Sequence, residues 1–130
     1  MNGSRPIALF VTHGTLGEEM IRTVVSILGP QTDVETVSNS GLSADGLAEA
    51  IESRLAAIPE RVPVVLFTDL AAGSCGIASR RVGRGGRDLR KITGVNLPML
   101  VEFFHYRDTL SLDELLPRME AKGKAGIVLL

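Results

Sequence analysis

A histidine lies where the first apolar run of the chain ends and a helical pattern begins. Residues 7–11 read IALFV, and His13 and Gly14 follow closely. A short apolar run that ends at a glycine is typical of a buried strand in a parallel sheet. Thr15, with Glu18 three residues on, predicts a capping box at the start of the helix. Ligands bind at the carboxyl ends of such strands, so His13 stands where chemistry is expected.

An acidic residue follows the most hydrophobic stretch of the chain. Residues 62–68 read VPVVLFT and predict a central parallel strand, whose proline must occupy the first positions, where a missing N–H is tolerated. Asp69 comes next, and a helix is predicted over residues 75–81. A flavodoxin-like strand order 2-1-3-4 makes this strand the neighbour of the first one. His13 and Asp69 would then face each other across the switch point of the sheet.

These two residue types suit phosphorylation of a histidine. The nucleophile is a neutral imidazole, and an ordinary histidine, with a pKa of about 6.5, is largely neutral near pH 7. A carboxylate that accepts the other ring N–H fixes the tautomer and stabilises the charge that develops. Helix N-termini supply N–H donors for phosphoryl oxygens. We therefore predict that His13 and Asp69 are catalytic and that the phosphate-binding residues are Gly14, Thr15, Gly73 and Ser74.

The composition restricts the class of protein. The 130 residues are enough for one domain, which we expect to span residues 1–130. A net charge of −1 argues against a nucleic-acid partner. The single cysteine, Cys75, fits a reducing compartment, and we find neither a membrane span nor a signal-peptide core, so a cytoplasmic location is expected. No Walker loop or cluster of metal ligands is evident, so neither a cofactor nor a metal is predicted.

Strand and helix patterns alternate along the rest of the chain. This alternation predicts an α/β fold with an open, mainly parallel sheet and helices on both faces. Three further strands are expected at residues 34–37, 91–95 and 126–130, and a flexible loop at residues 82–90. The remaining helices are predicted at residues 16–28, at residues 43–58 with Ser43 as the cap, from Pro98 onward, and at residues 111–121 with a Ser111–Glu114 capping box.

Three motifs resemble the IIA domains of the mannose-type sugar phosphotransferase system. Residues 12–14 (THG) resemble the family's phosphohistidine motif. Residues 68–80 carry Thr-Asp, then Gly-Ser, then Ala-Ser-Arg, in the order of the family's second motif. Residues 94–102 (GVNLPMLVE) resemble its long Gly-Val-Asn-x-Pro-Met-Leu-x-Glu stretch. Ala72 and Cys75 depart from the pattern, in which glycine and proline are usual at these two positions.

The resemblance implies a function and a set of partners. Family members accept a phosphoryl group from the carrier HPr and pass it to a IIB domain, within a sugar permease complex or in a regulatory pathway. By this resemblance, His13 is the phosphoacceptor through Nε2, Asp69 orients it, and Ser74 with neighbouring amides holds the phosphate. The resemblance also implies a homodimer in which the C-terminal strand is exchanged between subunits. We expect no membrane insertion of this chain itself.

Other interpretations stay open at this point. A phosphotransferase subunit of a dihydroxyacetone kinase shares the fold and the N-terminal histidine. A sensor that is phosphorylated without relaying the group is a second alternative. A small metal chelatase is a third, and it would need His105 close to His13. Five arginines at residues 80–90 could form a docking surface or a solvated face.

Overall fold

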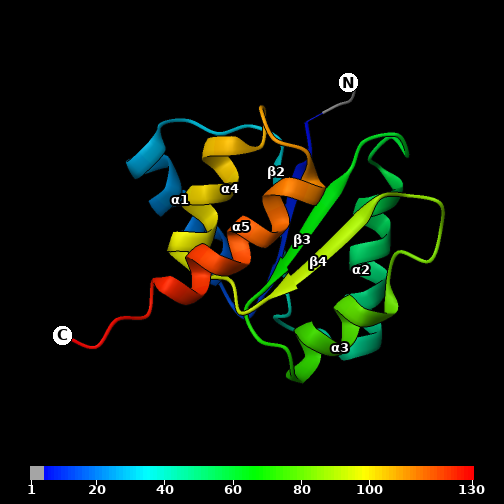
Figure 1. The fold of residues 1–130 in the computed structure, drawn as a ribbon. Coiled ribbons are helices and arrows are strands. Elements are labelled where there is room, and N and C mark those ends of the chain that lie inside the picture. The colour runs from blue at the N-terminus through cyan, green and yellow to red at the C-terminus, as the bar shows by residue number, and fades with distance from the viewer. Residues whose placement is uncertain (1–4) are drawn as a thin grey trace.

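Four parallel strands form one sheet in the order β2-β1-β3-β4 (Figure 1). The structure, a computed structural model, describes residues 5–130. Strand β1 (Ile7–Thr12) lies between β2 (Val34–Ser38) and β3 (Val64–Thr68), while β4 (Leu89–Thr93) forms the far edge. The predicted 2-1-3-4 order is therefore confirmed. Residues 1–4, part of the stretch that we judged too short for a signal peptide, lie outside the described residues.

Five helices cover the two faces of this sheet. Helices α1 (Leu16–Leu28), α4 (Leu97–Tyr106) and α5 (Leu112–Ala125) pack on one face, and α2 (Ala44–Ala56) and α3 (Gly73–Arg81) pack on the other (Figure 1). Helices α1 and α3 follow the neighbouring strands β1 and β3 and leave toward opposite faces. Their N-termini therefore both lie at the carboxyl edge of the sheet, as the doubly wound arrangement requires. Among the described helices, none combines the length and apolar character needed to cross a bilayer.

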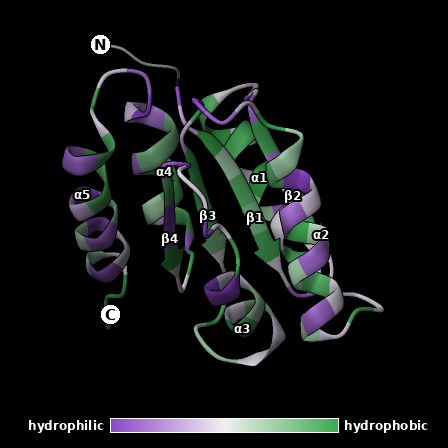
Figure 2. Ribbon diagram, turned by 90° about the vertical axis from the view of Figure 1, so that its right-hand side faces the viewer, coloured by the Kyte–Doolittle hydropathy of each residue, from purple (hydrophilic) through white to green (hydrophobic). Residues whose placement is uncertain are grey.

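Alternation along the two central strands divides the core into two layers. Phe10 and Phe67 face α1, α4 and α5, and their rings stack at 5.1 Å between centroids. Leu9 and Leu66 point to the opposite face, against α2 and α3. Both faces are covered, so β1 and β3 are hydrophobic throughout, whereas the edge strand β4 carries hydrophilic residues (Figure 2).

Several predicted boundaries shift in the structure, among them the starts of β4 and α3 and the end of α5, which extends to Ala125 instead of residue 121. Strand β4 begins at Leu89, inside the stretch that we expected to be a loop, because residues 89–93 pair along the whole of β3. Helix α3 begins at Gly73, two residues earlier than expected, with Ala72 as its N-cap. Ser74 is therefore inside the first turn of α3 and does not cap it.

Two of the three capping predictions are confirmed and one is wrong. Ser43 accepts from the Gly46 N–H, and Ser111 forms the expected box with Glu114. The box predicted at Thr15 is wrong, because its side chain makes no capping hydrogen bond. Thr12, at the end of β1, replaces it: its hydroxyl accepts the Gly17 N–H at 2.8 Å.

The predicted C-terminal strand is absent from this fold. Gly126 closes α5 by donating its N–H to the Lys122 carbonyl, and Ile127–Leu130 pair with no strand of the described chain. Their side chains are largely exposed, from 66% for Val128 to fully exposed for Leu130. These four residues therefore leave their apolar side chains exposed in the single chain.

Candidate functional site

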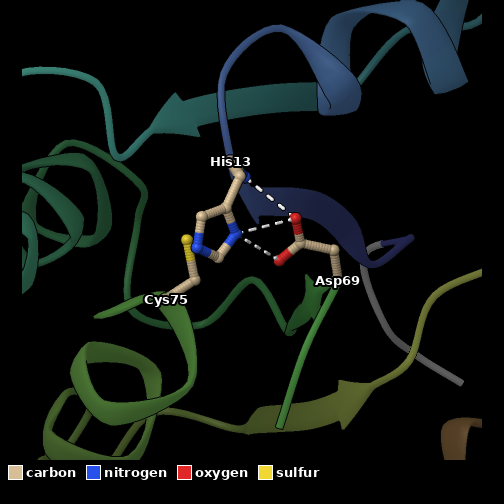
Figure 3. Close-up of side chains that lie close together, drawn as sticks. All are labelled: His13, Asp69 and Cys75. Carbon is tan, nitrogen blue, oxygen red and sulfur yellow. Dashed lines mark hydrogen bonds and ion pairs between the residues drawn. The ribbon is translucent and has the colours of Figure 1, made fainter. Parts of the chain in front are cut away.

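One carboxylate contacts His13 at two points. Asp69, directly after β3, accepts the backbone N–H of His13 at 2.9 Å through Oδ2. The same oxygen lies 3.0 Å from ring Nδ1, and Oδ1 lies 3.2 Å from it (Figure 3). Strands β1 and β3 pair with Val11 opposite Thr68, so the residues that follow them emerge side by side. The predicted juxtaposition of His13 and Asp69 is therefore present.

This geometry fixes the tautomer of the imidazole. An ionised carboxylate only accepts hydrogen bonds, so Nδ1 must carry the proton that it donates to Asp69. In the neutral ring the lone pair is then on Nε2, on the other side of the ring. Burial alone would raise the pKa of Asp69, but the hydrogen bonds from the His13 backbone and ring outweigh it and hold that pKa below its usual value. Asp69 is thus ionised and available to orient the ring near pH 7.

The loop after β1 is held by a residue that sequence reasoning missed. Gly14 has a φ of +57°, and its N–H donates to Asn39 Oδ1 at 3.0 Å. The Asn39 N–H in turn donates to the carbonyl of Thr12. Asn39 was not predicted to belong to the site, although it follows β2 at the same edge of the sheet as His13. The Gly14 N–H, expected to bind phosphate, is already engaged by this contact.

The start of α3 approaches the histidine ring directly. Gly73 has a φ of +78°, and a Cβ built on it would lie 3.8 Å from His13 Nε2. Gly73 and Ser74 belong to the first helical turn, whose N–H groups have no partner within the helix. The free side of the ring therefore faces a helix N-terminus, where the helix dipole favours an anion.

A buried thiol lies beside the same ring. Cys75 is fully buried, and ligand atoms of His13, Asp69 and Cys75 all lie within 4.8 Å of one another (Figure 3). Burial, and then the charge of Asp69, raise the pKa of this thiol to about 11. Cys75 is thus protonated near pH 7 and is a poor nucleophile.

Four exposed apolar side chains belong to the segments around His13. Leu16 begins α1, Leu42 follows β2, Leu70 follows Asp69, and Ile77 lies in α3. Each is between 40% and 56% exposed. Exposed apolar residues in the segments next to a functional group are typical of a surface that docks another protein.

Most of the arginines proposed as a docking surface have partners within the chain. Arg87 donates to four carbonyls at the end of α2 and in the loop after it. Arg90 pairs with Asp88 and Asp113, and Arg81 pairs with Asp45. Electrostatic docking through the whole arginine set is therefore not supported by these contacts.

The second histidine is not part of this cluster. His105 lies in the last turn of α4, exposed to solvent, and its ring contacts Tyr106 edge to face at 4.6 Å. Within residues 5–130, the potential metal ligands grouped with His13 are Asp69 and Cys75, not His105. The chelatase interpretation required a His13–His105 pair, and the structure does not provide it.

The chain is similar to IIA components of bacterial sugar phosphotransferase systems. A family model described as "PTS system fructose IIA component" (EIIA-man) matches residues 8–120. The mannose-specific EIIAB component of Escherichia coli K12 is 32% identical over 118 residues, which is 89% of this chain and 36% of that protein. The sorbose-specific EIIA component of Klebsiella pneumoniae is 27% identical over 114 residues, 88% of this chain and 84% of its own length. The chain thus spans about a third of the EIIAB relatives.

Solved structures share the fold. The crystal structure of a "putative phosphoenolpyruvate-dependent sugar phosphotransferase system (PTS) permease" from Klebsiella pneumoniae superposes with a TM-score of 0.83 at 21% identity, covering 99% of this chain and 93% of that one. The phosphotransferase component EIIA from Streptococcus agalactiae superposes with a TM-score of 0.81, also at 21% identity, covering 95% of each chain. At this level of identity the superpositions establish the fold alone.

Proposed function

The chain belongs to the EIIA-man family, the mannose-type IIA components of the phosphotransferase system, and on that premise we propose that it is a phosphoryl carrier. His13 accepts the phosphoryl group from phosphorylated HPr on Nε2 and passes it to a IIB domain. The observation that supports this most directly is the contact of Asp69 with Nδ1, which leaves the Nε2 lone pair free beside the N-terminus of α3.

The proposed transfer uses these groups in a fixed order. The Nε2 lone pair of His13 attacks the phosphorus of the donor's phosphohistidine, and the donor's P–N bond breaks as the new P–N bond forms. Asp69 keeps the Nδ1 proton in place and stabilises the positive charge that develops on the ring. The N–H groups of Gly73 and Ser74 at the start of α3 donate hydrogen bonds to the phosphoryl oxygens. Transfer to the IIB acceptor reverses these steps.

The loop after β1 has a different role from the one expected of Gly14. Since the Gly14 N–H is engaged by Asn39, we assign this glycine to the turn that presents His13 rather than to direct phosphate binding. Thr15 makes no capping bond, so its hydroxyl is available to the arriving phosphoryl group. Gly73, Ser74 and Thr15 are then the proposed phosphate-binding residues.

We assign the docking of HPr and IIB to the four exposed apolar side chains around His13. Leu16 and Leu70 lie nearest in sequence to the catalytic pair, and each is at least 40% exposed. A replacement such as Leu70→Ser should raise the KM for phosphorylated HPr and leave the slow transfer from a small phosphoryl donor such as acetyl phosphate unchanged. Equal loss with both donors would instead indicate damage to the site.

The exposed edge strand supports the homodimer that the resemblance implies. Within residues 5–130, strand β4 has no neighbour on its outer side, and a groove of about 660 Å³, which Ile127 helps to line, runs between β4 and α5. An unpaired edge beside an unpaired apolar tail is suited to pairing between two copies. Sedimentation of the chain with and without residues 127–130 tests this, and an equal mass for both would refute the exchange.

The deciding experiment follows labelled phosphate from phosphoenolpyruvate through Enzyme I and HPr. Wild type, His13→Ala and His105→Ala are compared, and the product is tested for the acid lability and alkali stability of phosphohistidine. Label on wild type and His105→Ala but not on His13→Ala is the expected result. An unlabelled wild type with HPr from the same cell would refute the relay. Stable label that reaches no IIB domain would favour a sensor.

A further inference from the structure

The site contains three kinds of metal-ligating atom in one place. A ring nitrogen of His13, a carboxylate oxygen of Asp69 and the sulfur of Cys75 all lie within 4.8 Å of one another (Figure 3). The proposed phosphoryl transfer uses the first two and has no role for the thiol. A nitrogen, an oxygen and a sulfur ligand are the donor types that Zn²⁺ takes in proteins.

The distances are close to those of a zinc site. Zinc bonds of about 2.0–2.3 Å in tetrahedral geometry separate the ligand atoms by roughly 3.5 Å. Ligand atoms up to 4.8 Å apart would therefore need to approach one another by at most about 1.3 Å. The side chain of His13 is 40% exposed, while that of Asp69 is 10% exposed and Cys75 is buried. The imidazole is thus the most accessible of the three groups, and a metal that binds Asp69 and the ring nitrogen beside it must replace the hydrogen bond between them.

Charge also favours a divalent cation at this position. Asp69 carries one negative charge, and a metal that binds Cys75 displaces the thiol proton to solvent and creates a second. With a neutral imidazole, the two negative charges balance Zn²⁺. A hard cation such as Mg²⁺ gains nothing from sulfur, so the thiol selects a thiophilic metal.

We propose that His13, Asp69 and Cys75 bind a thiophilic divalent cation of the Zn²⁺ type, and that this binding prevents phosphorylation of His13. Bound through Nε2, the metal occupies the acceptor lone pair. Bound through Nδ1, it shifts the ring proton to Nε2, which then has no lone pair for the phosphoryl group. In either case the metal-bound and phosphorylated states exclude each other. The regulatory part of this inference rests on the proposed function, whereas the metal site does not.

Metal binding is tested first, without any phosphoryl transfer. The reduced chain is titrated with Zn²⁺ in competition with a chromophoric chelator, and with Co²⁺ to detect a thiolate-to-cobalt charge-transfer band. Wild type should bind one ion per chain and show the band. Cys75→Ser and Cys75→Ala should lose the band and bind Zn²⁺ roughly 100-fold more weakly. His105→Ala, which removes the exposed histidine outside the cluster, should bind as wild type does, and circular dichroism checks the fold of each variant.

Phosphorylation is tested second, and for each protein the rate with Zn²⁺ is compared with the rate of the same protein without it. Zn²⁺ at a concentration that saturates wild type should reduce its phosphorylation by HPr at least tenfold, and a chelator should restore it. Cys75→Ser should be inhibited far less at the same concentration. No zinc binding by wild type, or equal binding by Cys75→Ser, would overturn the metal site. Failure of HPr to label any of the proteins would refute the proposed function and leave the binding result intact.

Discussion

Asp69 Oδ2 lies 2.9 Å from the backbone nitrogen of His13 and 3.0 Å from its ring nitrogen Nδ1. One carboxylate oxygen therefore fixes both the end of β1 and the orientation of the imidazole. The two contacts also stabilise the ionised carboxylate, which is why the pKa of Asp69 falls although burial opposes this. Phosphorylation of His13 should depend on Asp69 more than on any other neighbouring side chain.

The first prediction concerns this carboxylate. Asp69→Asn keeps the size of the side chain but removes the charge that stabilises the ring. We expect the rate of His13 phosphorylation by HPr to fall by roughly 10- to 100-fold, as when an orienting partner is lost in other sites. Rapid-quench measurement of phosphohistidine checks this. A rate within twofold of wild type would show that the carboxylate does not assist the transfer.

Asn39 allows a prediction about the loop that presents His13. Asn39→Ala removes the acceptor of the Gly14 N–H, so the turn loses one restraint. We expect a severalfold slower phosphorylation and a loss of about 1 kcal/mol in the free energy of unfolding. Ser40→Ala, in the same turn but without contact to Gly14, is the matched control and should leave the rate unchanged. Equal phosphorylation rates for wild type, Asn39→Ala and Ser40→Ala would show that Asn39 does not contribute to the phosphorylation of His13.

Replacing Gly76 tests the packing of α3 against the loop that carries Asp69. A Cβ at this position would lie 2.2 Å from the carbonyl oxygen of Ala71, a backbone atom that cannot rotate away. Gly76→Ala should lower the free energy of unfolding by more than about 2 kcal/mol. Gly46→Ala, in α2, meets only ordinary contacts at 3.5 Å and should stabilise the chain by about 0.5–1 kcal/mol. Urea unfolding of both variants distinguishes these outcomes.

Replacing Arg107 should lower the free energy of unfolding without altering the site around His13. Its buried guanidinium donates to the carbonyls of Pro6, Thr32 and Asp33 at the amino end of the sheet. Burial lowers its pKa to about 10, so it stays charged near pH 7. Arg107→Met removes these hydrogen bonds, although the Asp33 carbonyl still accepts the Ala8 N–H, and should cost on the order of 3 kcal/mol in urea unfolding.

The control for this variant is an exposed arginine. Arg22 pairs with Glu19 on the surface of α1, and Arg22→Met should change the free energy of unfolding by less than about 0.5 kcal/mol. At temperatures where both variants are folded, each should be phosphorylated at the wild-type rate. A selective loss of phosphorylation in Arg107→Met would mean that the amino end of the sheet is coupled to His13.

The local sequence pattern was sufficient to predict the main strands and helices of the chain. The apolar runs that became β1 and β3 are hydrophobic on both faces, and such runs form central strands wherever helices cover both sides. The contact between His13 and Asp69 was also predictable, because each of them follows one of these strands. Once the two strands are neighbours, the residues that follow them must meet.

Contacts between distant segments were decided only by the tertiary structure. Gly14 and Asn39 are 25 residues apart, and neither has a local pattern that reports their hydrogen bond. The cap of α1 comes from Thr12 rather than Thr15 because the strand directs that hydroxyl back at the helix. Cys75 lies against His13 because α3 starts at Gly73, two residues earlier than the pattern indicated. Periodicity reports which face of an element is buried, whereas these contacts depend on how the elements are placed against one another.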